Sequence, residues 1–221
     1  MPDSSTIYRR QKHLQVVISA RKSRDGLQLL VDSTGIKMLG EGEWKTKKHG
    51  AEYRRQWRKV HIGIDAETLE IRAIEVTSNA VGDAQVLPDL LAQIPEDEVL
   101  TSVHGDGAYD TKACYAAIAQ RNAAALIPTR KNGQPWKENT AGARARNETL
   151  RATKYLGRAL WQKWSGYHRR SLVETKMRCF KLLGERVMAR DFDRQVAELQ
   201  VRVAILNRFT QLGTLVTVRV A

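Results

Sequence analysis

Three apolar runs of strand length follow one another in the first third of the chain. The first spans residues 27–33 (LQLLVDS) and leads into a turn-forming Thr-Gly pair. The second and third span residues 60–65 and 69–77 and are joined by a short turn. Apolar and polar residues alternate in the second run, as they do in a half-buried strand. The sequence therefore predicts an antiparallel meander whose last two strands form a hairpin.

The pattern then changes to an alternation of helices and strands. The predicted segments are a helix at 84–93, a strand at 99–104, a helix at 111–121 and a strand at 124–128. Such alternation is typical of parallel strands joined by crossover helices. We therefore expect an α/β protein whose sheet mixes antiparallel and parallel pairing.

The remaining segments are expected to flank this sheet. Residues 1–26 are polar and basic and are interpreted as a helical or irregular lead-in, whereas residues 129–150 form a polar stretch that predicts an inserted loop. Further helices are predicted at 151–164, 169–183 and 194–212. One domain is thus expected over residues 27–212, followed by a tail at 213–221.

The chain carries a formal net charge of +13, from 37 Lys and Arg against 24 Asp and Glu. This excess predicts a polyanionic partner, and nucleic acid is favoured over a membrane surface because no basic amphipathic helix stands at either end. No apolar run approaches the roughly 18 residues of a membrane span, and no signal peptide is evident, so we expect a cytoplasmic protein. Its two cysteines, Cys114 and Cys179, exclude a disulfide scaffold and are expected to be reduced and buried.

Two segments hold most of the positive charge. Residues 144–190 contain 13 Lys and Arg against three acids. Residues 44–59 interleave cations with aromatic side chains, a pattern that favours nucleic-acid binding. The candidate DNA-binding cations of this second segment are Lys47, Lys48, Arg54, Arg55 and Lys59. The alternative for either segment alone is an ordinary solvated face.

Two aspartates stand directly after predicted strands. Asp32 ends the apolar run of what should be a central strand, and Asp106 lies between two glycines after the strand at 99–104. Ligands in open α/β sheets bind outside the carboxyl ends of strands, where both side chains would meet. The alternative is that each aspartate caps a turn or a helix.

Glu174 is the third candidate acid. On a helix at about 100° per residue, it shares one narrow stripe with Tyr167, Arg170, Arg178 and Lys181. Ordinary ion pairs at i,i+4 spacing could explain such a stripe. A carboxylate among cations also suits a metal ligand placed beside phosphate-binding groups, since Mg²⁺ prefers hard oxygen ligands and shares its shell with phosphate. Two such ions would support in-line displacement at a phosphodiester.

These motifs together resemble the DDE transposases of bacterial insertion sequences and, within them, the IS-five family of the IS-four/IS-five superfamily. The Y-R-E-K signature of that superfamily is matched, with every spacing intact, by Tyr167, Arg170, Glu174 and Lys181. Residues 31–35 (VDSTG) and 105–110 (GDGAYD) resemble its first and second aspartate motifs in the right order.

The resemblance implies a ribonuclease-H-like core. In that fold a mixed five-stranded sheet, its first three strands antiparallel, is flanked by helices, with the polar insertion before the helix that carries the glutamate. The acids implied to bind two Mg²⁺ ions, or Mn²⁺ in their place, are Asp32, Asp106 and Glu174. The residues implied to contact DNA near the cleavage site are Tyr167, Arg170 and Lys181, to which the charge pattern adds Arg178.

The implied reaction is hydrolysis at a transposon end, followed by attack of the freed 3′-hydroxyl on target DNA. Double-stranded DNA is then the partner, and a homo-oligomer, expected to be a dimer, would act on it at the bacterial nucleoid. Relatives usually carry an N-terminal region that binds the transposon ends, whereas Asp32 comes early in this chain. The alternatives are therefore a truncated, non-autonomous DNA-binding product that inhibits transposition or is a relic of it, and a simple ribonuclease-H-like nuclease.

Overall fold

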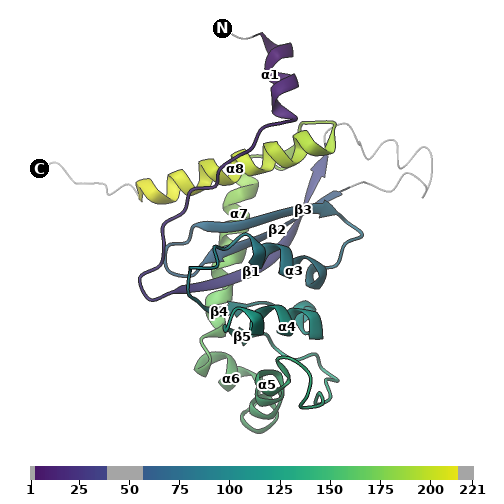
Figure 1. The fold of residues 1–221 in the computed structure, drawn as a ribbon, viewed down its shortest axis with the longest axis vertical. Coiled ribbons are helices and arrows are strands. Elements are labelled where there is room, and N and C mark those ends of the chain that lie inside the picture. The colour runs from purple at the N-terminus through teal and green to yellow at the C-terminus, as the bar shows by residue number, and fades with distance from the viewer. Residues whose placement is uncertain (1–2, 39–56, 214–221) are drawn as a thin grey trace, which may run out of the picture.

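A mixed sheet with strand order β3-β2-β1-β4-β5 forms the centre of the computed structural model, which describes residues 3–38 and 57–213 (Figure 1). Strand β1 (Leu27–Met38) pairs antiparallel with β2 (Trp57–Asp65), and β2 pairs antiparallel with β3 (Ile71–Ser78). On its other side, β1 pairs parallel with β4 (Leu100–His104), and β4 pairs parallel with β5 (Ala124–Leu126). The predicted α/β fold, with three antiparallel strands followed by parallel ones, is confirmed.

A sixth strand was not predicted. The two-residue strand β6 (Arg186–Val187) pairs parallel with the outer end of β1, at Lys37 and Met38. One edge of β1 pairs with β4 at the start of the strand and with β6 at its end. Between Leu30, which is the last residue to pair with β4, and Lys37, which is the first to pair with β6, no described residue pairs with this edge. This opening lies at the centre of the sheet.

Seven α-helices surround the sheet within the described residues. They are α1 (Ser4–Gln11), α3 (Asp83–Ala92), α4 (Lys112–Gln120), α5 (Ala143–Leu156), α6 (Arg158–Trp164), α7 (Ser171–Leu182) and α8 (Phe192–Leu212). Two 3₁₀ turns, η1 (Gly107–Tyr109) and η2 (Tyr167–Arg170), precede α4 and α7. None of the helices in these residues combines the length and hydropathy that a membrane span requires.

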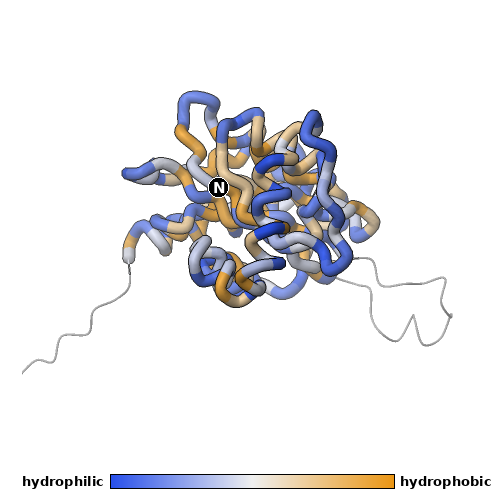
Figure 2. The backbone as a smooth tube through the Cα atoms, turned by 90° about the horizontal axis from the view of Figure 1, so that it is seen from below, coloured by the Kyte–Doolittle hydropathy of each residue, from blue (hydrophilic) through white to orange (hydrophobic). Residues whose placement is uncertain are grey.

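The two faces of the sheet bury separate apolar clusters. Leu29 and Val31 of β1 pack with α3 and α4, whereas Leu30 and Ile36 pack with α7 and α8. Successive side chains of a strand point to opposite faces, so Asp32, two residues after Leu30, points to the α7 side. Hydrophobic residues accordingly gather inside the molecule and hydrophilic ones along its outer loops (Figure 2).

The polar stretch at 129–150 is not a loop throughout. Helix α5 begins at Ala143 because Gly142 adopts a positive φ of 71°, and a Cβ at Gly142 would lie 2.7 Å from the Tyr115 side chain. The single helix predicted at 151–164 is instead divided at Gly157, whose φ is 81° and which ends α5 and precedes α6. At the N-terminal lead-in, α1 is the helical part.

Two further expectations are corrected. The helix predicted from residue 169 begins at Ser171, and the residues before it form η2, so Tyr167 does not share the α-helix of Glu174. Cys179 is half-buried, whereas Cys114 is buried as expected. Both cysteines are free thiols.

Candidate active site

Asp32 lies in the middle of β1, and not at the strand's end as predicted. Its register partner in β2 is Ile62, and β1 continues to Met38. It nevertheless comes just after Leu30, where pairing with β4 stops. The carboxylate therefore stands in the opening between β4 and β6, on the face covered by α7.

Asp106 follows β4 and caps the 3₁₀ turn η1. Its Oδ1 accepts a hydrogen bond of 2.8 Å from the Ala108 amide, which is the capping role considered as an alternative. The other oxygen, Oδ2, points toward Arg170, 3.9 Å from Nη2. Capping and a place in the site are thus compatible for this aspartate, since the two oxygens have different partners.

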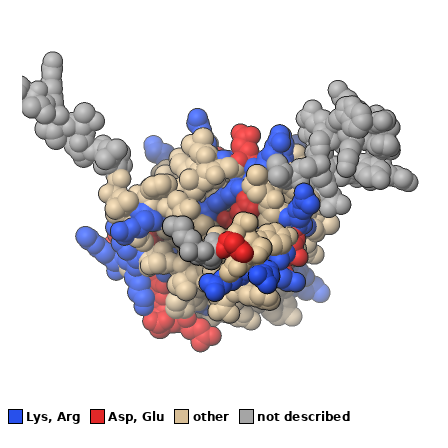
Figure 3. All heavy atoms as spheres, turned by 90° about the horizontal axis from the view of Figure 1, so that it is seen from above, with Lys and Arg blue, Asp and Glu red and all other residues tan. Residues whose placement is uncertain are grey.

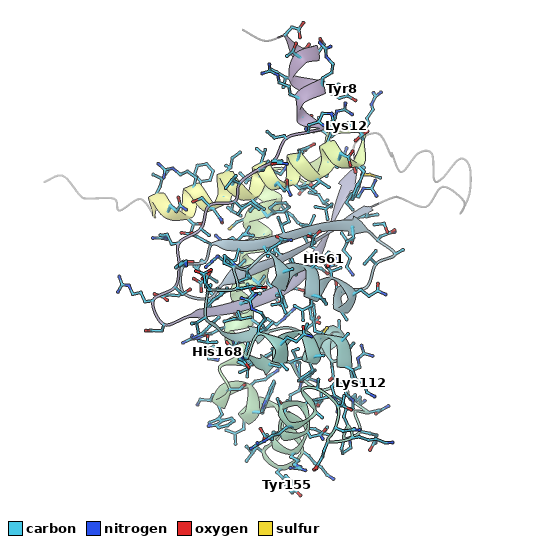
Figure 4. All side chains as sticks on the ribbon, in the orientation of Figure 1. Tyr8, Lys12, His61, Lys112, Tyr155 and His168 are labelled. Atoms are coloured by element: carbon cyan, nitrogen blue, oxygen red, sulfur yellow. The ribbon has the colours of Figure 1, made fainter. Side chains whose placement is uncertain are left out.

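Glu174 lies in the first turn of α7, one helical turn after Arg170. Its Oε1 is 2.8 Å from Arg170 Nη1. Tyr167, at the start of η2, packs against Trp161 with ring centroids 5.4 Å apart. Figure 4 labels the neighbouring His168 between α6 and the sheet, and the next two residues of η2, Arg169 and Arg170, donate to Gln28 and Asp32 of β1.

The Arg170 guanidinium contacts all three candidate acids. Nη2 donates to Asp32 Oδ2 at 2.9 Å and lies 3.9 Å from Asp106, and Nη1 donates to Glu174. The sequence predicted a role for Arg170 on DNA, and it did not predict this position among the acids. Three elements, β1, the turn after β4, and α7, thus meet at one positive group.

Burial and Arg170 act in opposite directions on Asp32. Burial raises the pKa of this carboxyl above its ordinary value, and Arg170 opposes the rise, as does the Ser33 amide that donates to it. The nearby charges of Asp106 and Glu174 raise it further. Burial lowers the pKa of Arg170, but the charges of the three carboxylates and of Tyr167 outweigh it, so the pKa of the guanidinium is raised above its ordinary value.

The donor set fits a hard divalent cation, since it consists of three carboxylates without a thiol or imidazole. Within the described part of the chain, no three His, Cys, Asp or Glu side chains lie close enough together to hold a metal ion as they stand. Each of the three carboxylates lies within 4.0 Å of the Arg170 guanidinium instead.

A cavity of about 470 Å³ opens beside two of the acids. Asp32 and Glu174 line it together with Arg178 and Lys181. The spacing of these residues on α7 therefore brings both predicted DNA-binding cations to the cavity that the carboxylates share. Asp106 is not part of its lining.

The cations predicted on the other basic segment are not all described. Lys47, Lys48, Arg54 and Arg55 lie outside the described residues. Lys59, on β2, lies 2.8 Å from Asp83 Oδ1. Burial raises the pKa of Asp83, but His61, Lys59 and Ser33 beside it outweigh burial and hold the pKa below its ordinary value.

One buried hydroxyl near the acids was missed at the sequence level. Tyr109, in η1, is almost fully buried, and its hydroxyl has no hydrogen-bond partner among the described residues. Burial raises its pKa, and so do the charges of Asp83, Asp32 and Asp106. Its position in the second aspartate motif, GDGAYD, was the available signal.

Two models of protein families match the chain. A family model described as "Transposase DDE domain" matches residues 23–208, and a second model with the same description matches residues 1–41. No solved structure matches the chain significantly. Because the first match spans well over half of the sequence, the chain belongs to the family of transposase DDE domains.

Proposed function

We propose that this chain cleaves DNA at the ends of a bacterial insertion sequence of the IS-five branch and transfers the freed 3′-hydroxyl to target DNA. The convergence of Asp32, Asp106 and Glu174 on one guanidinium carries the proposal. These acids come from distant parts of the sequence, and a fold without a use for them would not gather three carboxylates at the open centre of its sheet.

The three carboxylates would hold two Mg²⁺ ions, or Mn²⁺ in their place. Bound there, the ions would supply activation of the attacking oxygen and stabilisation of the leaving oxygen in an in-line displacement. The acids themselves would hold those ions through hard oxygen ligands. Asp32 would do so from a strand and Glu174 from a helix, and both are rigid elements.

Arg170 would exchange its carboxylate partners for a DNA phosphate during the reaction. A guanidinium that loses its carboxylates to divalent cations regains its capacity for bidentate contact with a phosphate. Lys181 and Arg178, which line the same cavity as Asp32 and Glu174, would bind further phosphates of the DNA backbone. Tyr167 would complete these contacts from η2, beside Arg170.

The partner in this proposal is double-stranded DNA, both the transposon ends and the target. A homo-oligomer, taken to be a dimer, would hold two ends together, and the protein would act at the bacterial nucleoid. The net charge of +13 supports a DNA partner, because each cation placed on a phosphate releases condensed counterions.

Cleavage of DNA carrying the element's terminal repeats tests the proposal. The wild-type protein should nick it in Mg²⁺ or Mn²⁺ and not in chelator, whereas Asp106→Asn should bind the DNA without nicking it. Asp97→Asn, which alters an exposed acid paired with Lys22, is the matched control and should cleave normally. Normal cleavage by Asp106→Asn would contradict the site. Binding without cleavage by the wild type would favour the non-catalytic alternative, and preference for an RNA–DNA hybrid would favour the nuclease.

A further inference from the structure

A second cavity, of about 540 Å³, is lined by residues of α5 and α6, which lie at the end of the molecule away from α1 (Figure 1). The segment after β5 lines one side of the cavity, and the C-terminal half of α5 with the start of α6 lines the other side. Five cations line it: Arg130, Lys131, Arg151, Lys154 and Arg158. No Asp or Glu is among its lining residues.

These cations are not neutralised by their surroundings. Within residues 3–38 and 57–213, none of the five side chains forms an ion pair with a carboxylate, and Arg130 meets Asp110 only through its backbone amide, at 2.9 Å. The neighbouring Arg144, in contrast, pairs with Glu148. At the opposite end of the molecule, Asp and Glu are present on the same face as Lys and Arg (Figure 3), and Arg194 pairs with Asp191. Uncompensated charge gathered in one concave place favours an anionic ligand.

The cavity is joined to the candidate active site by hydrogen bonds. Arg130 donates through Nε to the Gly107 carbonyl at 3.2 Å and through Nη2 to the Ala108 carbonyl at 3.4 Å. These carbonyls belong to the turn that Asp106 caps. The rim of the cavity thus lies directly beside one of the three acids.

The other rim also approaches the site. Arg158, which lines the cavity, is the first residue of α6. Tyr167 packs against Trp161 of the same helix, with ring centroids 5.4 Å apart. A DNA strand bound at the carboxylates could therefore continue past Tyr167 and α6 into the cavity.

Size and an exposed aromatic ring restrict the ligand. A volume of about 540 Å³ lies in the range of sites for small molecules, so the cavity suits roughly one or two nucleotides of one strand better than a duplex. Tyr155 lines the cavity with 82% of its surface exposed, and it lies at the far end of the molecule in Figure 4. Phosphate-binding cations beside an exposed aromatic ring are the combination that binds single strands.

We propose that this cavity holds a short single-stranded segment of the DNA that enters the active site, with one or two phosphates among the cations that line it and a base against Tyr155. The proposal rests on the proposed function, because it takes DNA as the substrate. It adds a binding site for an unpaired strand, formed by the segment after β5 together with α5 and α6.

Binding of a fluorescein-labelled oligothymidine, measured by anisotropy in EDTA, tests this site without cleavage. The double variant Arg151→Gln/Lys154→Gln removes two charges from the cavity. The matched control, Arg144→Gln/Lys163→Gln, removes two charges from α5 and α6 outside the lining. We expect the slope of log K against log salt to be less steep in the cavity variant than in the control, by about 1.4. This corresponds to about 0.7 for each single-strand phosphate contact that is lost.

Tyr155 is tested separately. Tyr155→Ala should weaken oligothymidine binding by about five-fold or more, the size expected for loss of one base–aromatic stack. Tyr155→Phe should retain the affinity. The charged side chains that are replaced are exposed, and a thermal melt checks that each variant is folded. If the double variant melts at a lower temperature than the wild type, the single variants Arg151→Gln and Lys154→Gln replace it. Each should then show about half the change in the salt slope.

Equal changes of the salt slope in the cavity variant and in its control would overturn the site. A loss that is as large for a duplex of the same length as for oligothymidine would overturn the single-strand assignment. Wild-type affinity in Tyr155→Ala would overturn the stacking contact. Repeating the titration in Asp32→Asn separates this inference from the proposed function, because oligothymidine binding in EDTA should survive that change even where cleavage does not.

Discussion

Arg170 Nη2 lies 2.9 Å from Asp32 Oδ2, across a sequence separation of 138 residues. This bond joins the central strand to the turn before α7, and the same guanidinium reaches Glu174 and Asp106. The negative charge of the site is therefore already balanced in part by a side chain of the protein. A divalent cation entering the site has to compete with that side chain.

Removal of the Arg170 charge should strengthen cation binding. A unit charge at 4 Å is worth about 1 kcal/mol even at the dielectric constant of water, so Arg170→Gln should bind Mn²⁺ about five-fold tighter or more. Calorimetric titration of Mn²⁺ without DNA measures this. Arg169→Gln is the control, because it makes the same change in charge while its guanidinium donates to Gln28. An affinity in Arg170→Gln no higher than in Arg169→Gln would contradict the competition.

Lys181 should contribute to DNA affinity without contributing to sequence preference. It lines the cavity shared by Asp32 and Glu174, where it could hold one phosphate. Lys181→Gln should weaken duplex binding uniformly across sequences and reduce the slope of log K against log salt by about 0.9. Lys163→Gln, an exposed cation outside that cavity, should leave the slope nearer the wild-type value. An unchanged slope in Lys181→Gln would mean that its charge serves the fold alone.

The sheet and most helices could be predicted because their signals are local. Alternation of period two is visible in 60–65, and helical spacing is visible in 194–212. Strand β6 could not be predicted, since two residues carry no period and their pairing depends on the outer end of β1. The division of α5 from α6 depends on the single residue Gly157, in a segment whose composition otherwise favours a continuous helix.

The residues of the site could be predicted from the sequence, whereas the contacts between them could not. Spacing along the chain singles out Glu174 and its neighbouring cations, but the position of Arg170 among three acids depends on where β1, β4 and α7 meet. Arg146 shows the same limit: in a run of exposed cations it is indistinguishable from Arg144, yet it is buried against Asp110. Long-range pairing of this kind leaves no trace in one sequence.

That buried pair should be important for stability. Arg146 contacts Asp110 through Nε at 2.7 Å and Nη2 at 3.2 Å, and its guanidinium stacks over Trp136 at 4.3 Å. Arg146→Met would leave a buried carboxylate without its partner, a loss of about 3–5 kcal/mol in the free energy of unfolding. Urea denaturation measures it. Arg144→Met, at an exposed position, should change stability by less than about 0.5 kcal/mol, and similar losses in the two variants would contradict the importance of the pair.

The two thiols should differ in reactivity although both are free. Cys114 is fully buried between α3 and α4, its Sγ donates to the Ala84 carbonyl at 3.3 Å, and burial raises its pKa. A raised pKa lowers the fraction of thiolate, which is the reactive form, at any pH below it. Iodoacetamide at pH 8 should therefore modify half-buried Cys179 first, as peptide mass spectrometry can show, and should reach Cys114 at least ten-fold more slowly.

Denaturant supplies the internal control for this difference. In concentrated urea the two thiols lose their surroundings and should react at comparable rates, so any remaining difference would be a property of the local sequence. Below the unfolding transition, Cys114 can react only when α4 separates from α3, and its modification rate should rise with urea while that of Cys179 changes little. Cys114 and Leu87 belong to one buried cluster between α3 and α4. Equal modification rates for the two cysteines in the native protein would mean that these helices separate far more often than this packing allows.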